Sequence, residues 1–349
     1  MKELEQLTLP LLMWYRENAR VLPWRSDPTP YGVWVSEIML QQTRVAAVLG
    51  YYRRFMEALP TVADLAAADE DALMKLWQGL GYYSRARNLQ KTARQIMTEH
   101  KGVFPNTYKD IRALAGVGDY TAGAISSIAF GIPAPAVDGN VLRVVARITG
   151  DEGDITTPAM KKRVTGQLSG LIPLEAPGEY NQALMELGAT VCLPNGAPLC
   201  EKCPAFDFCR ARMEERTDEL PVKAAKKPRR IEERTVFLIF RENRVALRRR
   251  GEKGLLAGLW EYPNEPAPAE DFLENWGLTV RQKERAGTGK HIFTHIEWHM
   301  NAVALEVEED TLPAGWVWCS RAELLNDYAL PNAFRAFEEK VMERLGHFA

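Results

Sequence analysis

The pattern of apolar residues changes once along this 349-residue chain, and the change limits the possible folds more than any other feature. Up to about residue 215, apolar residues recur at helical spacing, and short turns with Pro or Gly separate the periodic segments. From about residue 234 the pattern is that of short strands. Because a single hydrophobic core stops growing at about 250–300 residues, the length also predicts two domains.

The two domains are expected to differ in fold class. Residues 1–219 are predicted to be all helical, and residues 234–349 to form an α+β domain. The expected elements of the second domain are a hairpin, a second strand pair and a closing helix, at residues 235–240 and 245–247, 291–298 and 302–307, and 332–345.

Residues 220–233, between the two domains, are rich in Lys and Pro and contain little to bury, so we interpret them as a basic linker. From Pro221 to Lys253 there are twelve Lys or Arg against four Glu, in a chain whose net charge is −2. Such a local excess attracts phosphate, but it is equally compatible with a solvated linker. Charge alone leaves both interpretations open.

Composition places the chain among globular proteins, since 46% of its residues are hydrophobic and 26% are charged. No run approaches the roughly 18 apolar residues that a membrane helix needs. The N-terminus lacks an apolar stretch of the signal-peptide type. We therefore expect a cytoplasmic protein with no membrane partner.

Four of the five cysteines lie within eighteen residues, in a loop expected over residues 192–209. A disulfide framework does not suit a reducing cytoplasm, whereas clustered thiolates suit a metal site. Zinc and a [4Fe–4S] cluster are the two candidates. Structural zinc more often uses two close pairs, and only one C-x2-C is present, so the spacing favours the iron–sulfur cluster. The ligands would be Cys192, Cys200, Cys203 and Cys209.

A Gly-Val-Gly motif at residues 116–118 predicts a tight turn between two helices, within residues 110–131. Glycines on both sides of Val117 let backbone amides approach a phosphate closely, and the dipole of the following helix favours an anion. Alone, the motif is more often a plain helix–helix turn. Its weight depends on the residues that accompany it.

Two carboxylates are candidates for acid–base chemistry. Glu37 has apolar neighbours on a helix predicted over residues 33–46, and burial would raise its pKa toward that of a general acid. Asp138 is placed to cap a helix predicted over residues 141–148. Singly, each fits an ordinary structural role. As a converging pair they would protonate a leaving group and stabilise a cationic sugar, which is what glycosidic cleavage requires.

Together these motifs resemble those of the MutY-type adenine DNA glycosylases, a family of the helix–hairpin–helix glycosylase superfamily. The resemblance extends over essentially the whole chain and is strongest in residues 20–210. Besides the hairpin, aspartate and cysteine motifs, the matching stretches are residues 22–25 (LPWR), 35–43 (VSEIMLQQT) and 79–89 (GLGYYSRARNL).

The resemblance implies a role for each matching residue. Glu37 would be the acid that protonates adenine N7, and Asp138, held by Asn140, would be the carboxylate that faces the oxocarbenium ion. Gln42 and Tyr82 match residues that wedge into the base stack and support the flipped-out base. Further matches lie around the adenine pocket or at the hairpin: Trp24, Arg25, Leu40 and Gln182 in the pocket, and Val117 and Gly118 at the hairpin.

One position separates branches of the superfamily. Relatives that also cut the strand, such as endonuclease III, carry a Lys two residues after the second hairpin glycine, where this chain has Tyr120. No Schiff base can form there, so water is expected to complete the reaction and leave an abasic site in an intact strand. Tyr120 also matches the tyrosine beside the sugar in some family members. This residue and the extra C-terminal domain count against an endonuclease III-like enzyme for oxidised pyrimidines.

The C-terminal domain resembles the MutT-like, Nudix-related domain that recognises 8-oxoguanine. The family commonly has Phe-Ser-His where this chain has Phe293-Thr294-His295, and threonine keeps the hydroxyl. A working Nudix hydrolase needs a Mg²⁺-binding box, but the required Glu and Arg positions hold Asn264 and Phe272, so that activity is excluded. The first cysteine interval is seven residues, where the family usually has six.

The resemblance therefore implies base excision repair, by hydrolysis of adenine mispaired with 8-oxoguanine or guanine in double-stranded DNA. A monomer that holds one [4Fe–4S] cluster and acts at the bacterial nucleoid is expected. The non-enzymatic alternative is a DNA-binding module whose cysteines hold zinc, and an assay of base release discriminates the two.

Overall fold

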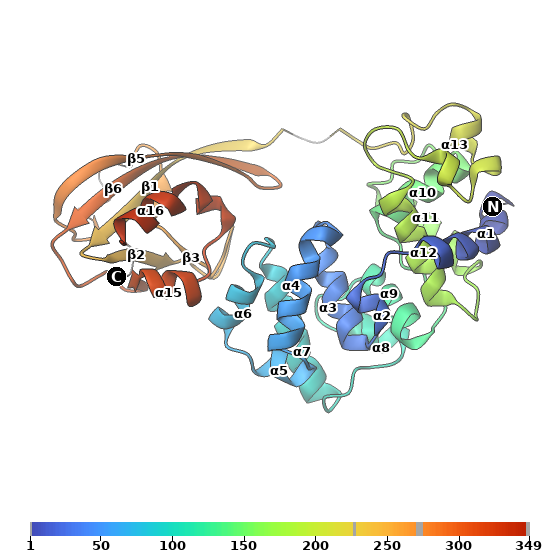
Figure 1. Cartoon of the computed structure of the whole chain (residues 1–349), viewed down its shortest axis with the longest axis horizontal. Coiled ribbons are helices and arrows are strands. Elements are labelled where there is room, and N and C mark those ends of the chain that lie inside the picture. The colour runs from blue at the N-terminus through green and yellow to red at the C-terminus, as the bar shows by residue number, and fades with distance from the viewer. Residues whose placement is uncertain (1, 226–227, 270–274, 347–349) are drawn as a thin grey trace. The chain divides into compact units, whose positions relative to one another are not determined.

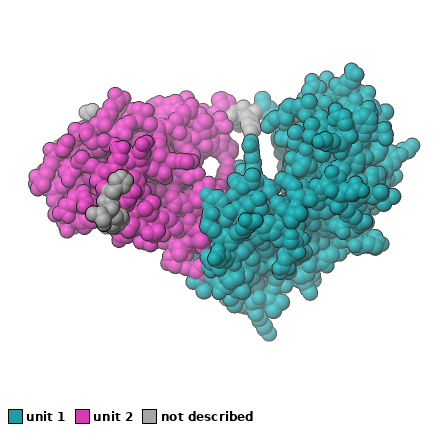
Figure 2. All heavy atoms as spheres, viewed as in Figure 1, with its two compact units in different colours: residues 1–67, 87–225 teal, residues 68–86, 226–349 magenta. Residues whose placement is uncertain are grey.

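The computed structural model describes residues 2–225, 228–269 and 275–346, and its contacts divide the chain into two units. One unit holds residues 1–67 and 87–225, and the other holds residues 68–86 and 226–349 (Figure 2). The second unit thus combines the strand-forming part of the chain with a segment from its helical part.

The described residues of the first unit form helices and connecting loops, with no strand, as the sequence predicts. In chain order (Figure 1) the helices are α1 (Lys2–Asn18), α2 (Pro23–Ser26), α3 (Pro30–Leu40), α4 (Val45–Ala58), α5 (Val62–Ala67), α7 (Ser84–Glu99), α8 (Tyr108–Ala113), α9 (Asp119–Phe130), α10 (Gly139–Thr149), α11 (Pro158–Ser169), α12 (Pro177–Thr190) and α13 (Arg210–Met213), with the short 3-10 helices η1 (Cys200–Lys202) and η2 (Phe206–Phe208).

Local capping explains where many of these helices begin and end. The side chains of Thr29, Thr107 and Thr157 cap α3, α8 and α11 by accepting hydrogen bonds from backbone amides of the first turn. Gly131 and Gly150 follow α9 and α10 in the left-handed conformation, with φ of 65° and 66°, which an L side chain rarely adopts. Helix α9 therefore ends where the predicted hairpin segment, residues 110–131, ends.

The helix predicted over residues 33–46 is two helices in the structure. Helix α3 ends at Leu40 and α4 begins at Val45. Between them Gln42 has a φ of 59°, in the left-handed region, so the helix cannot continue through it. The break places Gln42 on a turn rather than on the helix that carries Glu37.

Helix α12 of the first unit packs against α1, α9 and α10. Buried aliphatic residues of these helices share one core, which also includes Cys209 and packs against Cys192 and Cys203. None of the described helices of the chain is long and apolar enough to cross a lipid bilayer.

The second unit contains a mixed sheet. Its elements are α6 (Glu70–Trp77), β1 (Arg230–Arg241), β2 (Arg244–Arg249), β3 (Trp260–Glu261), β4 (Asn264–Pro266), β5 (Val280–Ile292), β6 (Ile296–Val307), β7 (Trp316–Ser320), α15 (Arg321–Asn326), η3 (Asn332–Phe337) and α16 (Glu338–Arg344). The strand order is β3-β2-β1-β6-β5, with β4 paired to β1 and β7 to β2. Strands β1 and β6 run parallel, and the other pairs run antiparallel.

Alternate residues of β1 face opposite sides of this sheet, as the period of a strand requires. Val236 and Leu238 join a core that includes aromatic residues of η3, whereas Phe237 and Ile239 join a smaller core on the other side. The sheet is therefore buried on both faces along this strand.

Several strand boundaries differ from the sequence-based prediction. Strand β1 begins at Arg230, inside the expected linker of residues 220–233, and residues 226–227 of that linker lie outside the described residues. The expected strand at residues 291–298 is instead the turn between β5 and β6 with the strand ends on either side. Strand β5 escaped prediction because most of its side chains are polar and exposed or half-buried, which leaves no apolar alternation.

The expected closing helix at residues 332–345 consists of η3 followed by α16. Its apolar side chains Phe334, Phe337 and Val341 are buried against the sheet, as an amphipathic helix would be.

Candidate active site

A cleft of about 1360 Å³ in the first unit collects most of the predicted site residues. Its walls come from α2, α3, the turn after α3, the loop before α9, and parts of α9, α10 and α12. The predicted residues that line it are Trp24, Arg25, Glu37, Leu40, Gln42, Gly118, Tyr120, Asp138, Asn140 and Gln182.

Glu37 is buried in this cleft, with 5% of its surface exposed. The hydroxyl of Tyr120, on α9, donates a hydrogen bond of 2.5 Å to Glu37 Oε2. The pKa of Glu37 is raised to about 7. Burial is the largest cause and the charge of Asp138 adds to it, while the hydrogen bond from Tyr120 and the charge of Arg25 act in the opposite direction. Glu37 therefore holds a proton near neutral pH, as a general acid must.

Asp138 is the N-cap of α10, as predicted. Its Oδ1 accepts a hydrogen bond from the backbone amide of Val141 and its Oδ2 accepts one from Asn140 Nδ2, both at 2.8 Å. Burial raises the pKa of Asp138, and these hydrogen bonds lower it in part because they favour the ionised carboxylate. The structure thus adds a desolvation cost at Asp138, which the sequence signal for a helix cap does not indicate.

Arg143 connects this end of α10 to the cysteine loop. Its Nη2 donates to Asn140 Oδ1 at 2.8 Å and to the carbonyl of Gly188 at 2.7 Å, and its Nε donates to the carbonyl of Cys192 at 2.8 Å. The sequence offered no specific signal for Arg143, because an arginine on an otherwise apolar helix face resembles an ordinary structural residue.

The hairpin has the expected helix–turn–helix form, with α8 ending at Ala113 and α9 beginning at Asp119. Gly116 has a φ of 71°, and a Cβ there would lie 3.1 Å from the Asn88 side chain, so glycine is required at that position. The space around Gly118 is open, because a Cβ at this position would meet nothing within 4 Å. The side chain of Val117 is buried rather than directed to the cleft, so any contact it makes with DNA would come from its backbone.

The four clustered cysteines line one cavity, together with Arg147, Arg212 and apolar residues. All four are free thiols. Burial raises the pKa of Cys203 to about 12 and also raises those of Cys200 and Cys209, so their thiolates need a cationic partner. Among the described residues, no group of three or more His, Cys, Asp or Glu side chains is arranged to hold a metal ion.

In the second unit, Tyr82 and Thr294 meet. Their hydroxyl oxygens are 3.1 Å apart, and both side chains are exposed. Tyr82 has a φ of 48°, a left-handed conformation that costs energy for a side chain of this size. The sequence motifs placed these two residues in separate roles and gave no indication that they touch.

The ring of Phe293, which precedes Thr294, packs against two other aromatic rings. Its ring is 4.9 Å from that of Trp298 and 4.5 Å from that of His291, in edge-to-face arrangements. Trp298 is in turn held by a hydrogen bond of 2.9 Å from its Nε1 to Glu232 and by the guanidinium of Arg234, 4.6 Å from its ring centre.

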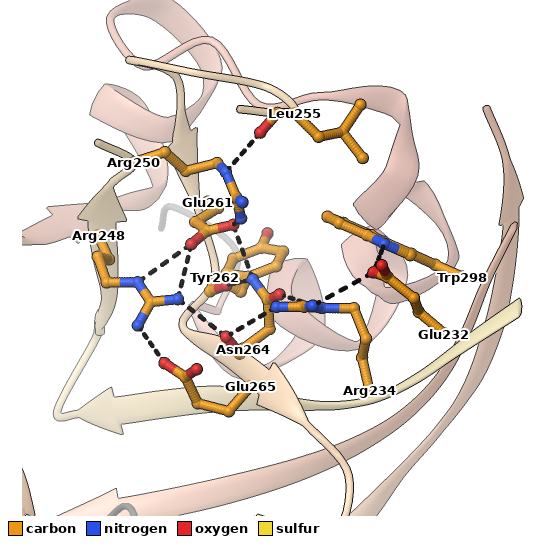
Figure 3. A network of polar contacts seen from close by, with 10 residues as sticks. All are labelled: Glu232, Arg234, Arg248, Arg250, Leu255, Glu261, Tyr262, Asn264, Glu265 and Trp298. Atoms are coloured by element: carbon orange, nitrogen blue, oxygen red, sulfur yellow. Dashed lines mark hydrogen bonds and ion pairs between the residues drawn. The ribbon is translucent and has the colours of Figure 1, made fainter. Parts of the chain in front are cut away.

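A buried polar network surrounds Asn264, which stands where the Mg²⁺-binding box of a Nudix hydrolase requires Glu (Figure 3). Glu261 accepts hydrogen bonds from Arg248 and Arg250, and Asn264 donates to Glu261 at 2.7 Å and accepts from Arg234 at 2.7 Å. The Glu261 carboxylate is thus bonded to other side chains of the same domain. Asn264 is fully buried in the network, and Phe272 lies outside the described residues.

The cleft also contains an ion cluster that the sequence motifs did not indicate. Glu186, on α12, is 1% exposed and binds both Arg20 and Arg25. Burial raises the pKa of Glu186, but hydrogen bonds and charges of the two arginines outweigh it and bring the value to about 2. A single Glu among apolar residues of α12 gave no sequence signal, because its partners are more than 160 residues away.

Both parts of the chain match known protein families. A family model described as HhH-GPD superfamily base excision DNA repair protein matches residues 35–168, and one described as a NUDIX domain matches residues 235–340. The adenine DNA glycosylase of Homo sapiens is 35% identical over 94% of this chain and 73% of its own length.

Two solved structures are similar to the helical part. A thermostable thymine-DNA glycosylase has a TM-score of 0.56 and 28% identity, covering 61% of this chain and 98% of that one. A non-covalent endonuclease III–DNA complex has a TM-score of 0.50 and 25% identity, covering 59% of this chain and 94% of that one.

Proposed function

The chain belongs to the adenine DNA glycosylases of the helix–hairpin–helix base-excision repair superfamily, and we propose that it hydrolyses adenine from double-stranded DNA where adenine is paired with 8-oxoguanine or guanine. The observation that carries this proposal is the buried Glu37–Tyr120 pair, which lines the same cleft as Asp138. A protonated acid and a second carboxylate are the two groups that departure of a base from its sugar requires.

The reaction begins with an adenine that has left the base stack and entered the cleft. Trp24, Leu40 and Gln182 line the walls around it. Glu37 donates its proton to adenine N7, so the electrons of the breaking glycosidic bond move into a ring that is already protonated. Water adds to the sugar carbon and loses a proton, which restores the acid form of Glu37. The products are free adenine and an abasic site.

Asp138 stabilises the cationic sugar while that bond is broken. Its carboxylate is oriented by the amide of Val141 and by Asn140, so it need not rearrange as positive charge develops. Tyr120 contributes a hydroxyl rather than an amine at the corresponding position, and the strand therefore remains intact.

Contacts with DNA would be made by the rim of the cleft and the hairpin. Gln42 is exposed on a turn at the rim, where it can enter the space that the flipped base leaves. Gly118 lies at the N-terminus of α9, a position where backbone amides and the helix dipole favour a phosphate. We expect the protein to bind its duplex as a monomer.

The Tyr82–Thr294 pair is the proposed contact with the base opposite adenine. The two hydroxyls can donate to and accept from the edge of 8-oxoguanine, and His295 lies next to them in the same exposed turn. Threonine supplies the same hydroxyl as the serine that is common in the family.

A [4Fe–4S] cluster is the proposed occupant of the cysteine cavity, held by Cys192, Cys200, Cys203 and Cys209. The fit rests on four free thiols that line one cavity, and on the burial that disfavours the thiolates of Cys200, Cys203 and Cys209 unless positive charge compensates them. When bound, the cluster would supply structural cross-linking of the loop. Through Arg143, that loop is connected to Asn140.

The test is single-turnover base release from four duplexes that differ in the base opposite adenine: 8-oxoguanine, guanine, cytosine and thymine. We expect free adenine and alkali-sensitive abasic sites with the first two, and no product trapped by borohydride. Iron and zinc should be measured in the same preparation, and iron should be found. Efficient trapping of wild-type protein on DNA, or release that ignores the opposite base, would contradict the proposal.

A further inference from the structure

Glu186 is a buried carboxylate of the same cleft that the reaction above leaves without a role. Its side chain has no exposed surface, yet its two oxygens accept four hydrogen bonds. Oε1 accepts from the backbone amide of Arg20 at 3.2 Å and from its Nε at 2.6 Å. Oε2 accepts from Nη2 of Arg20 and from Nη2 of Arg25, both at 2.8 Å.

These bonds hold Arg25 at the wall of the cleft. The Arg25 side chain is only 15% exposed, its Nη1 donates to the carbonyl of Arg20 at 3.2 Å, and its guanidinium is 5.5 Å from the centre of the Tyr15 ring. A buried arginine needs an acid to compensate its charge. Among the described residues, Glu186 is the acid that bonds to it.

The charge of Arg25 reaches Glu37. Burial raises the pKa of Glu37, and Arg25 acts against that effect because a nearby cation favours the ionised carboxylate. The other titratable and charged groups that line the cleft or pack beside α3 are Arg20 and Glu186, Arg44 and Tyr52, Asp119 and Tyr120, Asp138 and Arg143, Lys161 and Lys223.

We propose that Glu186 is a positioning residue for the general acid: it holds Arg25 in place and offsets its charge, so that Glu37 keeps the proton it delivers to the base. The inference rests on the proposed role of Glu37. Helix α12 then has an electrostatic role in the reaction, in addition to its packing against α1, α9 and α10.

The first test is the pH profile of single-turnover adenine release by full-length Glu186→Gln protein. Glutamine keeps the shape and removes the negative charge, so Arg25 is left uncompensated and the ionised form of Glu37 becomes more favourable. Because Glu37 acts in its protonated form, release falls as pH rises through its pKa. We expect the midpoint of this fall to move down by about one pH unit, with about a tenfold loss of rate above the wild-type midpoint and near-normal release at the acid plateau.

Arg20→Gln should move the midpoint the other way. It removes one of two cations and leaves Glu186 with Arg25 alone, so the surplus positive charge near Glu37 disappears. The Arg20 side chain is 37% exposed, and water screens its charge, so the upward movement should be smaller than the downward one. The two substitutions are at residues that bind each other. A general loosening of the cleft cannot move the midpoint of the pH profile in opposite directions in the two variants.

Glu179→Gln is the matched control, because it makes the same charge change on the same helix, in a surface ion pair with Arg16 outside the cleft lining. Its profile should overlay that of the wild type. The inference is overturned if Glu186→Gln lowers release by one factor at every pH, or if Arg20→Gln moves the midpoint down or leaves it unchanged. If Glu186→Gln does not fold, the inference is tested by the direction in which Arg20→Gln moves the midpoint of the pH profile. A wild-type profile without an alkaline fall would instead overturn the role proposed for Glu37.

Discussion

A carboxyl group that is 5% exposed and close to a second carboxylate is much harder to ionise than one in water, even though the hydrogen bond from Tyr120 favours the ionised form of Glu37. For Glu37 the pKa rises from 4.5 to about 7, and since one pKa unit corresponds to about 1.4 kcal/mol, its surroundings disfavour the charged form by roughly 3 kcal/mol. Tyr120 cannot relieve this by giving up its own proton, because burial raises its pKa well above the usual value. Below about pH 7 the carboxyl group is therefore mostly protonated.

Replacing Glu37 with Gln should lower single-turnover adenine release by about 10²–10⁴-fold, because the amide keeps the shape but has no proton to transfer at this pH. Wild-type release should decline as pH rises through about 7, the pKa of Glu37, since the protonated form is lost there. The residual release of the variant should lack that decline. Affinity for the mispaired duplex, measured by fluorescence anisotropy, should remain close to that of the wild type. Near-normal release by the variant would show that another group supplies the proton.

At the scale of elements, the chain segment that leads to Asp138 packs closely against α9. A Cβ added at Gly123 of α9 would lie 2.1 Å from the carbonyl oxygen of Pro135, a distance that real atoms do not reach. Asn181 of α12 fastens the same segment, since its side chain accepts a hydrogen bond from the amide of Ala136 and donates to the carbonyl of Ala134. Helices α9 and α12 thus determine where the N-terminus of α10, and with it Asp138, is placed.

Gly123→Ala should therefore lower the free energy of unfolding by about 1–3 kcal/mol, the usual cost of overpacking, and should reduce adenine release because the Asp138 segment must shift. Gly166→Ala on α11 is the control, since a Cβ there meets nothing within 4 Å. Alanine in an exposed helix should raise stability by about 0.5–1 kcal/mol and leave release unchanged. Chemical denaturation measures the free energy of unfolding of both variants. Equal effects of the two substitutions would mean that the segment adapts to the added methyl group.

At the scale of the whole molecule, chemistry and the proposed lesion contact belong to different units. The cleft is lined by residues of the first unit, whereas Tyr82 and Thr294 both belong to the second. The residues 68–86 are fastened to the strand-containing part by Lys75, which donates to the carbonyls of Leu324 and Tyr328 at 3.1 and 3.0 Å. Removing the C-terminal part would therefore leave the cleft complete but take away the partners of this segment.

A protein truncated after Ala225 should still release adenine opposite guanine, because every residue that lines the cleft remains. It should lose much of the difference in rate between 8-oxoguanine and guanine, because Thr294 is absent. Single-turnover rates on the two duplexes measure this difference. Thr294→Val in the full chain is the matched control, since it removes one hydroxyl and preserves the packing. If the truncated protein prefers 8-oxoguanine as strongly as the full chain, the assignment of Thr294 is wrong.

Local sequence signals determined the helical class of the first part, the hairpin turn, the N-cap at Asp138 and the change to strands in the last third. Each depends on residues within a few positions of one another: a glycine that alone tolerates a left-handed φ, an aspartate that bonds the amide three residues later, a period of apolar side chains. The same kind of information failed at β5, whose polar side chains hide its period, and at the break after Leu40, where no Gly or Pro marks the turn.

Only the tertiary structure decided which groups share an environment. Glu37 and Tyr120 are 83 positions apart, Tyr82 and Thr294 are 212 apart, and Glu186 is 161 from Arg25. Burial and charge act through space over a few ångströms, so the pKa of Glu37 depends on α2, α9 and α10 together and on no single stretch of chain. The sequence supplied two carboxylates and a tyrosine. Folding removed the water around them, and this is what makes one carboxylate an acid.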